Sequence, residues 1–347
     1  GLAIGDALGK PGSTCSHVEI LAATRGLGVI GFEGLPKVSP FVDPDTYEIG
    51  ATSDETAFSR AVAVSLIRCR EFNLLDCMHA HVAEVDRGVC GMGNASRERL
   101  SKIKDYFTSR CMWGQAPSTP PENVSLGTGV AMKIAPLAIH ACMAGRDATV
   151  HIQELGLATH GDLRASLGAY PITTLLQAIL GHGSQFCVDR RRAIDCISDH
   201  LPMVRYEENL WERQMLQCRA THHRNTQEGR TFHSRVQLVL DLAADPSGLI
   251  FAEDIDKVAA CIGSDGTVMT TVPMALAIFL RHPEEFAQAM FEAVNLGNDT
   301  DALASMVGAL VGANVGLTEI PVDLINGTQD SGEAIRLADM MMETVWR

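Results

Sequence analysis

The chain has 347 residues, with 28 Lys or Arg against 42 Asp or Glu, so its formal net charge is −14. Because nucleic-acid phosphates are bound mainly by Lys and Arg, this acidic surplus argues against a nucleic-acid partner. The surplus is compatible with a site in which carboxylates bind metal cations. A hydrophobic content of 46% is enough for a large core and excludes general disorder.

The composition also bears on the compartment. Ten cysteines are spread from Cys15 to Cys261, and no pair has the two-residue spacing of zinc or redox sites. We interpret them as free thiols in a reducing compartment and expect a cytoplasmic protein. No stretch reaches the ~20 apolar residues of a membrane span, so we expect no membrane partner. The chain starts with an apolar, glycine-rich segment without basic residues, and we expect no secretory signal.

Hydrophobic periodicity predicts helices along almost the whole chain. The first is expected over residues 1–8. A long irregular segment over residues 24–53 contains Pro36, Pro40 and Pro44, and loops of this length are often functional. A second helix is expected from Ser53 or Asp54 to about Arg70. Further helices are expected over residues 74–86, 95–110, 129–143, 147–158, 162–181, 187–199, two within 204–246, and then 250–262, 267–281, 283–295, 301–314 and 331–345.

The organisation of these segments favours one domain. The two helices of residues 204–246 are joined by a polar turn that contains His222 and His223. Two adjacent histidines resemble a metal pair, but no partner motif accompanies them, and we interpret them as solvated. No strand ladder, linker or internal repeat is evident. The sequence therefore predicts a single compact all-α domain over residues 1–347, with a dozen or so helices.

Two short acidic segments stand out, each at the start of a predicted helix. They run from Thr52 to Thr56 and from Gly297 to Asp301. Acidic residues there have an ordinary explanation, because they cap free N–H groups and suit the helix dipole. Two clusters of the same design favour another interpretation, since four carboxylates brought together repel one another unless cations neutralise them. Such oxygen ligands select hard ions such as Mg²⁺, Mn²⁺ or Ca²⁺, and two clusters can hold two metals ~4 Å apart.

A third segment, from Ser125 to Gly129, opens a predicted helix. Its glycines let the backbone approach a ligand, and the N–H groups of a helix start favour phosphate. A plain turn at the start of a helix is the alternative interpretation.

Five motifs, in order, resemble the ADP-ribosylglycohydrolase family, which includes the dinitrogenase reductase-activating glycohydrolases and the ADP-ribosylserine hydrolases. They are Gly5-Asp6-Ala7-Leu8-Gly9, Ser53-Asp54-Glu55-Thr56, the segment from Gly127 to Pro136, Thr159-His160, and the segment from Ala293 to Asp301. Each motif is weak alone, but five in order over nearly the whole chain indicate the family's fold. The resemblance implies an all-α domain with a central cleft that holds two Mg²⁺ ions.

The resemblance also implies roles for individual residues. The metal ligands would be Ser53, Asp54, Glu55, Asp299 and Asp301, and the catalytic carboxylates Asp54, Glu55 and Asp299. The contacts to substrate would be made by Asp6, Gly91, Gly93, Ser125, Leu126, Gly127, Gly129 and His160. The metals, with Mn²⁺ as an alternative to Mg²⁺, would hold the distal ribose and a water that attacks its anomeric carbon. The implied ligand is ADP-ribose or an ADP-ribosylated protein.

Several positions depart from the family pattern. Ala302 stands where the family usually has a hydroxyl ligand, so one of the two metals would be bound less strongly. Glu55 replaces an Asp and reaches one methylene further, and Ser13 stands where an acidic residue is frequent. Lys133 stands where the family often has Arg, and it is either a surface charge or a support of the metal loop.

These departures leave two functions open. One is a divergent Mg²⁺-dependent glycohydrolase that cleaves the N- or O-glycosidic bond of an ADP-ribosylated side chain or a related small molecule. The other is a catalytically weakened or inactive ADP-ribose-binding or structural member of the same fold. Two-metal phosphoryl transfer also uses clustered carboxylates, but no P-loop pattern is present.

Overall fold

The protein is described by a computed structural model that is mostly helical, with 72% helix and 2% strand among the residues it describes. The all-α prediction is therefore confirmed. The described residues are 1–33, 39–40, 47–109, 115–119, 121, 124–181, 187–218, 231–244 and 255–346.

Helices make up most of the described elements. They are α1 (Leu2–Gly9), α2 (His17–Ala23), α3 (Asp54–Cys69), α4 (Leu74–Asp86), α5 (Asn94–Ser109), α6 (Ala135–Met143), α7 (Thr149–Thr159), α8 (Leu163–Leu167), α9 (Ala169–Gly181), α10 (Arg190–Cys218), α11 (Phe232–Ala244), α13 (Ile255–Ile262), α14 (Val268–Arg281), α15 (Phe286–Asn295), α16 (Thr300–Val315), α17 (Val322–Gly327) and α18 (Ser331–Trp346). Three 3₁₀ turns, η1 (Lys10–Gly12), η2 (Ala131–Lys133) and η4 (Leu317–Glu319), and two strands, β1 (Cys15–Ser16) and β2 (Gly297–Asn298), complete the described elements. No helix among them is long and apolar enough to cross a membrane.

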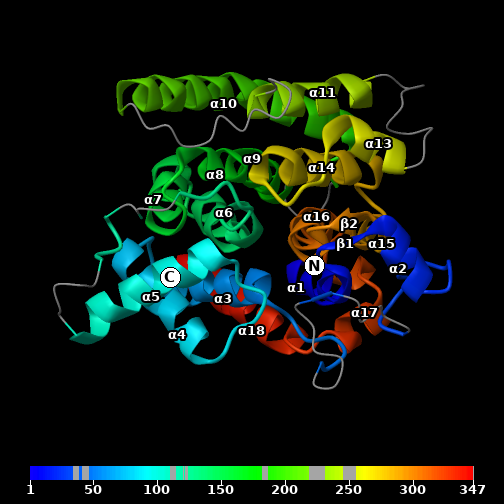
Figure 1. Ribbon diagram of the computed structural model, residues 1–347, viewed down its shortest axis with the longest axis horizontal. Coiled ribbons are helices and arrows are strands. Elements are labelled where there is room, and N and C mark those ends of the chain that lie inside the picture. The colour runs from blue at the N-terminus through cyan, green and yellow to red at the C-terminus, as the bar shows by residue number, and fades with distance from the viewer. Residues whose placement is uncertain are drawn as a thin grey trace.

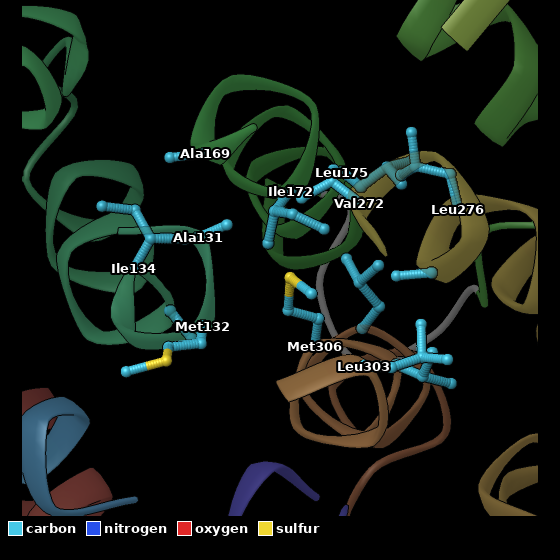
Figure 2. Packing of buried hydrophobic residues seen from close by; sticks show 14 of the residues in the cluster. Ala131, Met132, Ile134, Ala169, Ile172, Leu175, Val272, Leu276, Leu303 and Met306 are labelled. Carbon is cyan, nitrogen blue, oxygen red and sulfur yellow. The ribbon is translucent and has the colours of Figure 1, made fainter. Parts of the chain in front are cut away.

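The helices are stacked in layers, with α10 and α11 on one side and α4, α17 and α18 on the other (Figure 1). Between them, α9 and α14 pack on α16, and α16 packs on α1. Figure 2 shows Ile172 and Leu175 of α9, Val272 of α14, and Leu303 and Met306 of α16 pointing toward one another. Each of these side chains is at most 1% exposed, which fixes α16 in the centre of the core.

The contact between α1 and α16 joins segments that are almost three hundred residues apart in the sequence, blue against orange in Figure 1. Its cause is the glycine spacing of α1, because residues four apart lie on one face of a helix. A Cβ added at Gly5 would overlap the carbonyl group of Ala304, and one at Gly9 would overlap that of Thr300. The two backbones therefore touch directly, and Asp6 is brought to the start of α16.

A short strand pairing strengthens the same junction. β1 and β2 are antiparallel, with Cys15 opposite Asn298 and Ser16 opposite Gly297. The sequence predicted no strand ladder, and two paired residues are too few to leave an alternating pattern. The pairing links the segment after α1 to the segment before α16, where the second acidic cluster begins.

Two predicted helices are each divided in the structure. The helix expected over residues 129–143 is η2 followed by α6, with the junction at Ile134, before Pro136. The helix expected over residues 162–181 is α8 followed by α9, with the break at Gly168. A side chain at this glycine would overlap Val268, so close packing against α14 explains the residue.

One predicted break is wrong. The helix expected to end near residue 199 continues as α10 through Pro202 to Cys218. Proline removes one backbone hydrogen bond, but Leu201 and Val204 on either side are buried, and this packing sustains the helix. His222 and His223 lie outside the described residues.

Helix α2 was not predicted either. This helix has a capping box, in which the Ser16 side chain accepts from the backbone N–H of Glu19 and the Glu19 carboxylate accepts from that of Ser16. The Ser-x-x-Glu spacing was the available signal.

Candidate functional site

The first acidic cluster lies at the start of α3 and is held there by Asp6 of α1. Asp6 is fully buried, and its carboxylate accepts hydrogen bonds from the backbone N–H groups of Ser53, at 2.9 Å, and Thr56, at 3.1 Å. The hydroxyl groups of Ser53 and Thr56 also donate to it. Asp6 therefore caps α3 from another helix, and its contact with substrate stays a prediction.

Within the first cluster, a hydroxyl and a carboxylate are paired. Ser53 Oγ lies 2.6 Å from Glu55 Oε2. Ser53, Asp54 and Glu55 are all less than 8% exposed. The sequence-predicted metal ligands of this cluster are thus adjacent and largely shielded from water.

The second cluster lies at the start of α16. Asp301 Oδ1 accepts hydrogen bonds from Ser13 Oγ, at 2.8 Å, and from the backbone N–H of Ala302, at 3.1 Å. Asp299, at the N-cap position, accepts from Thr128 Oγ1 at 3.2 Å. The roles of Ser13 and Thr128 were not predicted, although Thr128 lies between two glycines of the 125–129 segment.

The carboxylates of the two clusters affect each other's ionisation. Burial, together with the charges of Asp301 and Asp6, raises the pKa of Asp54 to about 7. Burial and the neighbouring carboxylates, Asp54 first, raise the pKa of Glu55 well above its usual range. The pKa of Asp299 is raised in the same way, by burial and by the charge of Asp301. Each cluster therefore disfavours the ionised form of the other.

The donor set is chemically suited to a divalent metal. Carboxylate and hydroxyl oxygens are the ligands of hard cations, and a cation relieves the repulsion that raises these pKa values. Within the described part of the chain, no group of three or more His, Cys, Asp or Glu side chains is arranged to hold one ion. The five predicted metal ligands, Ser53, Asp54, Glu55, Asp299 and Asp301, therefore have the oxygen donors that a hard cation prefers. Their binding of a metal stays a prediction.

Gly91 lies against the first cluster. Its φ is +88°, in the left-handed region that favours glycine, and a Cβ there would lie 2.7 Å from Asp54 Oδ1. The backbone thus approaches Asp54 more closely than a side chain would permit. Around Gly93 a Cβ would meet no atom within 4 Å, so this glycine borders open space.

The 125–129 segment and His160 form one unit. The backbone N–H of Ser125 donates to the carbonyl oxygen of His160 at 2.9 Å, and that of Gly127 donates to Ser125 Oγ at 3.1 Å. A Cβ at Gly129 would lie 2.7 Å from the His160 ring. Leu126 anchors the segment to α14, because its carbonyl oxygen accepts from the N–H of Val268 at 2.8 Å.

His160 is a neutral support for this segment. Its side chain is 3% exposed, and Nδ1 lies 2.8 Å from Thr159 Oγ1. Burial, with a smaller effect of the Lys133 charge, lowers the pKa of His160 to about 3. The ring is therefore uncharged at physiological pH.

Lys133 is a buried cation near the first cluster, and its interpretation as a surface charge is wrong. It is 2% exposed, and Nζ lies 5.5 Å from the centroid of the Phe58 ring. Burial lowers the pKa of Lys133 to about 8, and its charge in turn lowers the pKa of Asp54. Lys133 thus offsets part of the negative charge of the site.

Known proteins provide an independent comparison. A family model described as ADP-ribosylglycohydrolase matches residues 1–347. ADP-ribosylhydrolase ARH3 of Gallus gallus is 24% identical over 362 residues, which cover 99% of this chain and 91% of that protein. The Mus musculus ARH3 is 25% identical, covering 85% of this chain and 76% of the relative. A solved chain of an ADP-ribosylglycohydrolase-related protein complex has the same fold, with a TM-score of 0.64, 20% identity, and coverage of 99% of this chain and 95% of that chain.

Proposed function

The chain belongs to the ADP-ribosylglycohydrolase family, and from this premise we propose that it hydrolyses the glycosidic bond between an ADP-ribosyl group and its carrier. The carrier is a protein side chain, joined by an N- or O-glycosidic bond, or a related small molecule. The proposal is supported by the mutual influence of the two acidic clusters, because the charge of Asp301 raises the pKa of Asp54 and the charge of Asp54 raises the pKa of Asp299.

We propose that the metal is Mg²⁺, with Mn²⁺ as an alternative, in up to two sites. Ser53, Asp54, Glu55, Asp299 and Asp301 would hold it, since they are the clustered oxygen donors. A bound divalent cation supplies a water of lowered pKa and orients ribose hydroxyl groups.

The chain's own carboxylates would move the proton of the reaction. A general acid or base works best when its pKa lies near the working pH, and the pKa of Asp54 is raised to about 7. Glu55 and Asp299 are the other candidates, and the pKa of each is raised in the same direction. One of these groups accepts a proton from the attacking water, and a proton is returned to the departing nitrogen or oxygen.

The 125–129 segment would bind the diphosphate. Ser125, Leu126 and Gly127 of this segment are only partly buried, and a glycine lets the backbone come close to a ligand. The neutral His160 beneath Gly129 supports the segment without adding charge. Gly91 and Gly93 would border the same ligand next to Asp54.

The test is release of ADP-ribose from peptides carrying ADP-ribosylserine or ADP-ribosylarginine, with and without Mg²⁺. We expect Mg²⁺-dependent release that falls roughly 10²–10⁴-fold in Asp54→Asn and Asp299→Asn. Wild-type rates in both variants, or equal rates without metal, would overturn the proposal.

A second function is favoured by Ala302 and Ser13. Ala302 is buried and carries no hydroxyl, and Ser13 provides no carboxylate at the site. Both features are compatible with a protein that binds ADP-ribose and does not cleave it. This function would be favoured if calorimetry shows that ADP-ribose binds while no ADP-ribose is released from either peptide in excess Mg²⁺. Release of ADP-ribose from either peptide excludes it.

We also propose a reducing, cytoplasmic compartment. Among the described residues, eight cysteines form no disulfide bond. Reduced thiols on this scale are typical of proteins kept under reducing conditions.

A further inference from the structure

Arg99 is a buried arginine on α5 whose hydrogen-bond partners lie outside that helix. It is 1% exposed, and a cation at this depth is stable only when its donors are satisfied. Its guanidinium group donates five hydrogen bonds, with distances from 2.5 to 3.3 Å. The acceptors are the side-chain oxygen of Gln115 and the carbonyl oxygens of Ala116, Pro117, Thr119 and Ala158. These oxygens are uncharged, so the five bonds fix other parts of the chain in place and neutralise no carboxylate.

The five acceptors belong to two separate parts of the chain. Four of them lie in the 115–119 segment and are reached by the two Nη atoms. The fifth is the carbonyl oxygen of Ala158 in the last turn of α7, which accepts from Nε at 2.6 Å. A guanidinium group is planar and its donors point in fixed directions, so Arg99 sets the position of one part relative to the other.

Both parts adjoin His160. Ala158 precedes it by two residues in the sequence. Shortly after the other part, Pro121 packs on Gly161, since a Cβ at Gly161 would lie 2.7 Å from Pro121 Cγ. The φ of Gly161 is +68°, so its backbone also favours glycine. The position of His160 therefore depends on both parts of the chain that Arg99 ties together.

His160 in turn supports the segment that we propose to bind the diphosphate. Its carbonyl oxygen accepts from the N–H of Ser125 at 2.9 Å, and a Cβ at Gly129 would lie 2.7 Å from its ring. His160 is 3% exposed, and closely packed groups transmit a displacement to their neighbours. A shift at the end of α7 would therefore move the ring and displace the 125–129 segment.

We propose that Arg99 is a positioning residue for substrate binding, which holds the end of α7 and the 115–119 segment so that His160 supports the 125–129 segment. The inference rests on the proposed function, because it assumes that the 125–129 segment binds the ADP-ribosyl group. It concerns affinity more than catalysis. The carboxylates of the site lie at the starts of α3 and α16, and none of them accepts one of the five hydrogen bonds.

The experiment measures binding and turnover separately in the full chain. Calorimetry gives the affinity for ADP-ribose, and the kinetics of ADP-ribose release from a modified peptide give KM and kcat. Arg99→Lys keeps the charge, but three donors on one atom cannot reach both parts of the chain. We expect the affinity to fall and KM to rise by about tenfold or more, because small displacements of binding groups are costly. We expect kcat to stay within about threefold of wild type, since an interaction lost equally from the ground state and the transition state changes KM alone.

Arg190 provides the matched control. It is partly buried at the start of α10, and its guanidinium donates to the carbonyl oxygens of Leu280, at 2.7 Å, and Arg281, at 3.3 Å. These acceptors lie at the end of α14, whereas the 125–129 segment contacts Val268 at its start. Arg190→Lys should lower the melting temperature but leave the affinity for ADP-ribose and KM within about twofold of wild type, because distant sites act independently.

Gln115→Ala is a milder variant of the same test. Gln115 is partly buried, and the substitution removes one acceptor of Arg99 while the backbone bond from Gln115 to the carbonyl oxygen of Lys102 remains. The loss of one hydrogen bond should raise KM about threefold. Thermal unfolding checks that each variant is folded, and this variant decides the question if Arg99→Lys does not fold.

Three results would overturn the inference and leave the proposed function standing. In the first, Arg99→Lys and Gln115→Ala are folded and bind ADP-ribose like wild type, so Arg99 only stabilises the fold. In the second, kcat falls while KM is unchanged, so Arg99 acts on the reaction and not on binding. In the third, Arg190→Lys weakens binding as much as Arg99→Lys, so the effect is a general loss of stability. A wild-type protein that neither binds nor releases ADP-ribose would contradict the proposed function itself, and this inference with it.

Discussion

At the scale of single residues, Asp6 shows how a buried carboxylate can serve a site without belonging to its reactive groups. It is fully buried on α1, yet it accepts the N–H groups of Ser53 and Thr56 that begin α3. Burial, opposed by these hydrogen bonds, raises the pKa of Asp6 to about 6. Its role follows from its partners, which are visible only in the folded chain.

Asp6→Asn should destabilise the protein. The amide keeps the shape but turns an N–H₂ group toward donors, so buried N–H or O–H groups lose their acceptor, at a cost of about 2 kcal/mol. Urea unfolding measures the change. Asp147→Asn is the control. The Asp147 carboxylate also accepts hydrogen bonds from a backbone N–H and a hydroxyl, both of Thr149, but Asp147 is exposed. Its substitution should therefore lower the stability much less. Equal effects of the two substitutions would contradict the role of Asp6.

The raised pKa of Asp54 makes the stability of the protein depend on pH and on bound metal. Its pKa is about 7 when folded and its ordinary value is 3.8, so the folded state binds more protons between about pH 4 and 7. The contribution of Asp54 to stability is therefore lost as the pH rises through this window, and a cation that stabilises the carboxylate restores it. We expect the increase in melting temperature caused by Mg²⁺ to grow from pH 5 to pH 7.5. An increase that is the same at all pH values, or that shrinks, would argue against this account of the site.

At the scale of elements, direct backbone contact between α1 and α16 sets the distance between the two clusters. Gly5 and Gly9 of α1 allow this backbone contact. After η1, the pairing of β1 with β2 holds the same two segments of the chain together. The consequence is that Ser13 reaches Asp301, 288 positions further along the chain, while Asp6 of α1 reaches the start of α3. The geometry of the site is thus a property of this helix pair.

Gly5→Ala tests this contact. The added methyl group would overlap the carbonyl of Ala304, so α1 must shift, at a cost of about 1–3 kcal/mol in the free energy of unfolding. Gly332→Ala is the control, since a Cβ there meets nothing within 4 Å and alanine favours a helix such as α18. Chemical denaturation should show a loss for the first and a neutral or favourable change for the second. A harmless Gly5→Ala would mean that the close approach is not needed.

Helices with local signals were predictable from the sequence, and those governed by packing were not. The helix expected over residues 74–86 is observed as α4 with the same bounds, since Asn73 caps it and its apolar positions recur at helical spacing. A helix was expected to end near residue 199, but α10 continues through Pro202, whose neighbours are buried. The break at Gly168 depends on α14, which is distant in the sequence.

At the scale of the whole molecule, the site is assembled from both ends and the middle of the chain. The acidic residues at 53–55 and 299–301 could be identified from composition and spacing, but their meeting was implied only by resemblance to a family. Ser13 and Thr128 could not be assigned to Asp301 and Asp299 beforehand, because those contacts depend on how α1 and the 125–129 segment pack. The burial of Lys133, close enough to Asp54 for its charge to lower the pKa of that carboxyl group, could not be predicted for the same reason.

The central claim is that the two clusters act as one catalytic unit. The most direct measurement is kcat/KM for ADP-ribose release in Asp54→Asn, Asp299→Asn and the variant with both changes. Residues that act as a unit give non-additive losses, so we predict that the double variant is scarcely slower than the slower single variant. Losses that multiply, with the double variant slower by the product of the two single factors, would show that the clusters act independently and would contradict the claim.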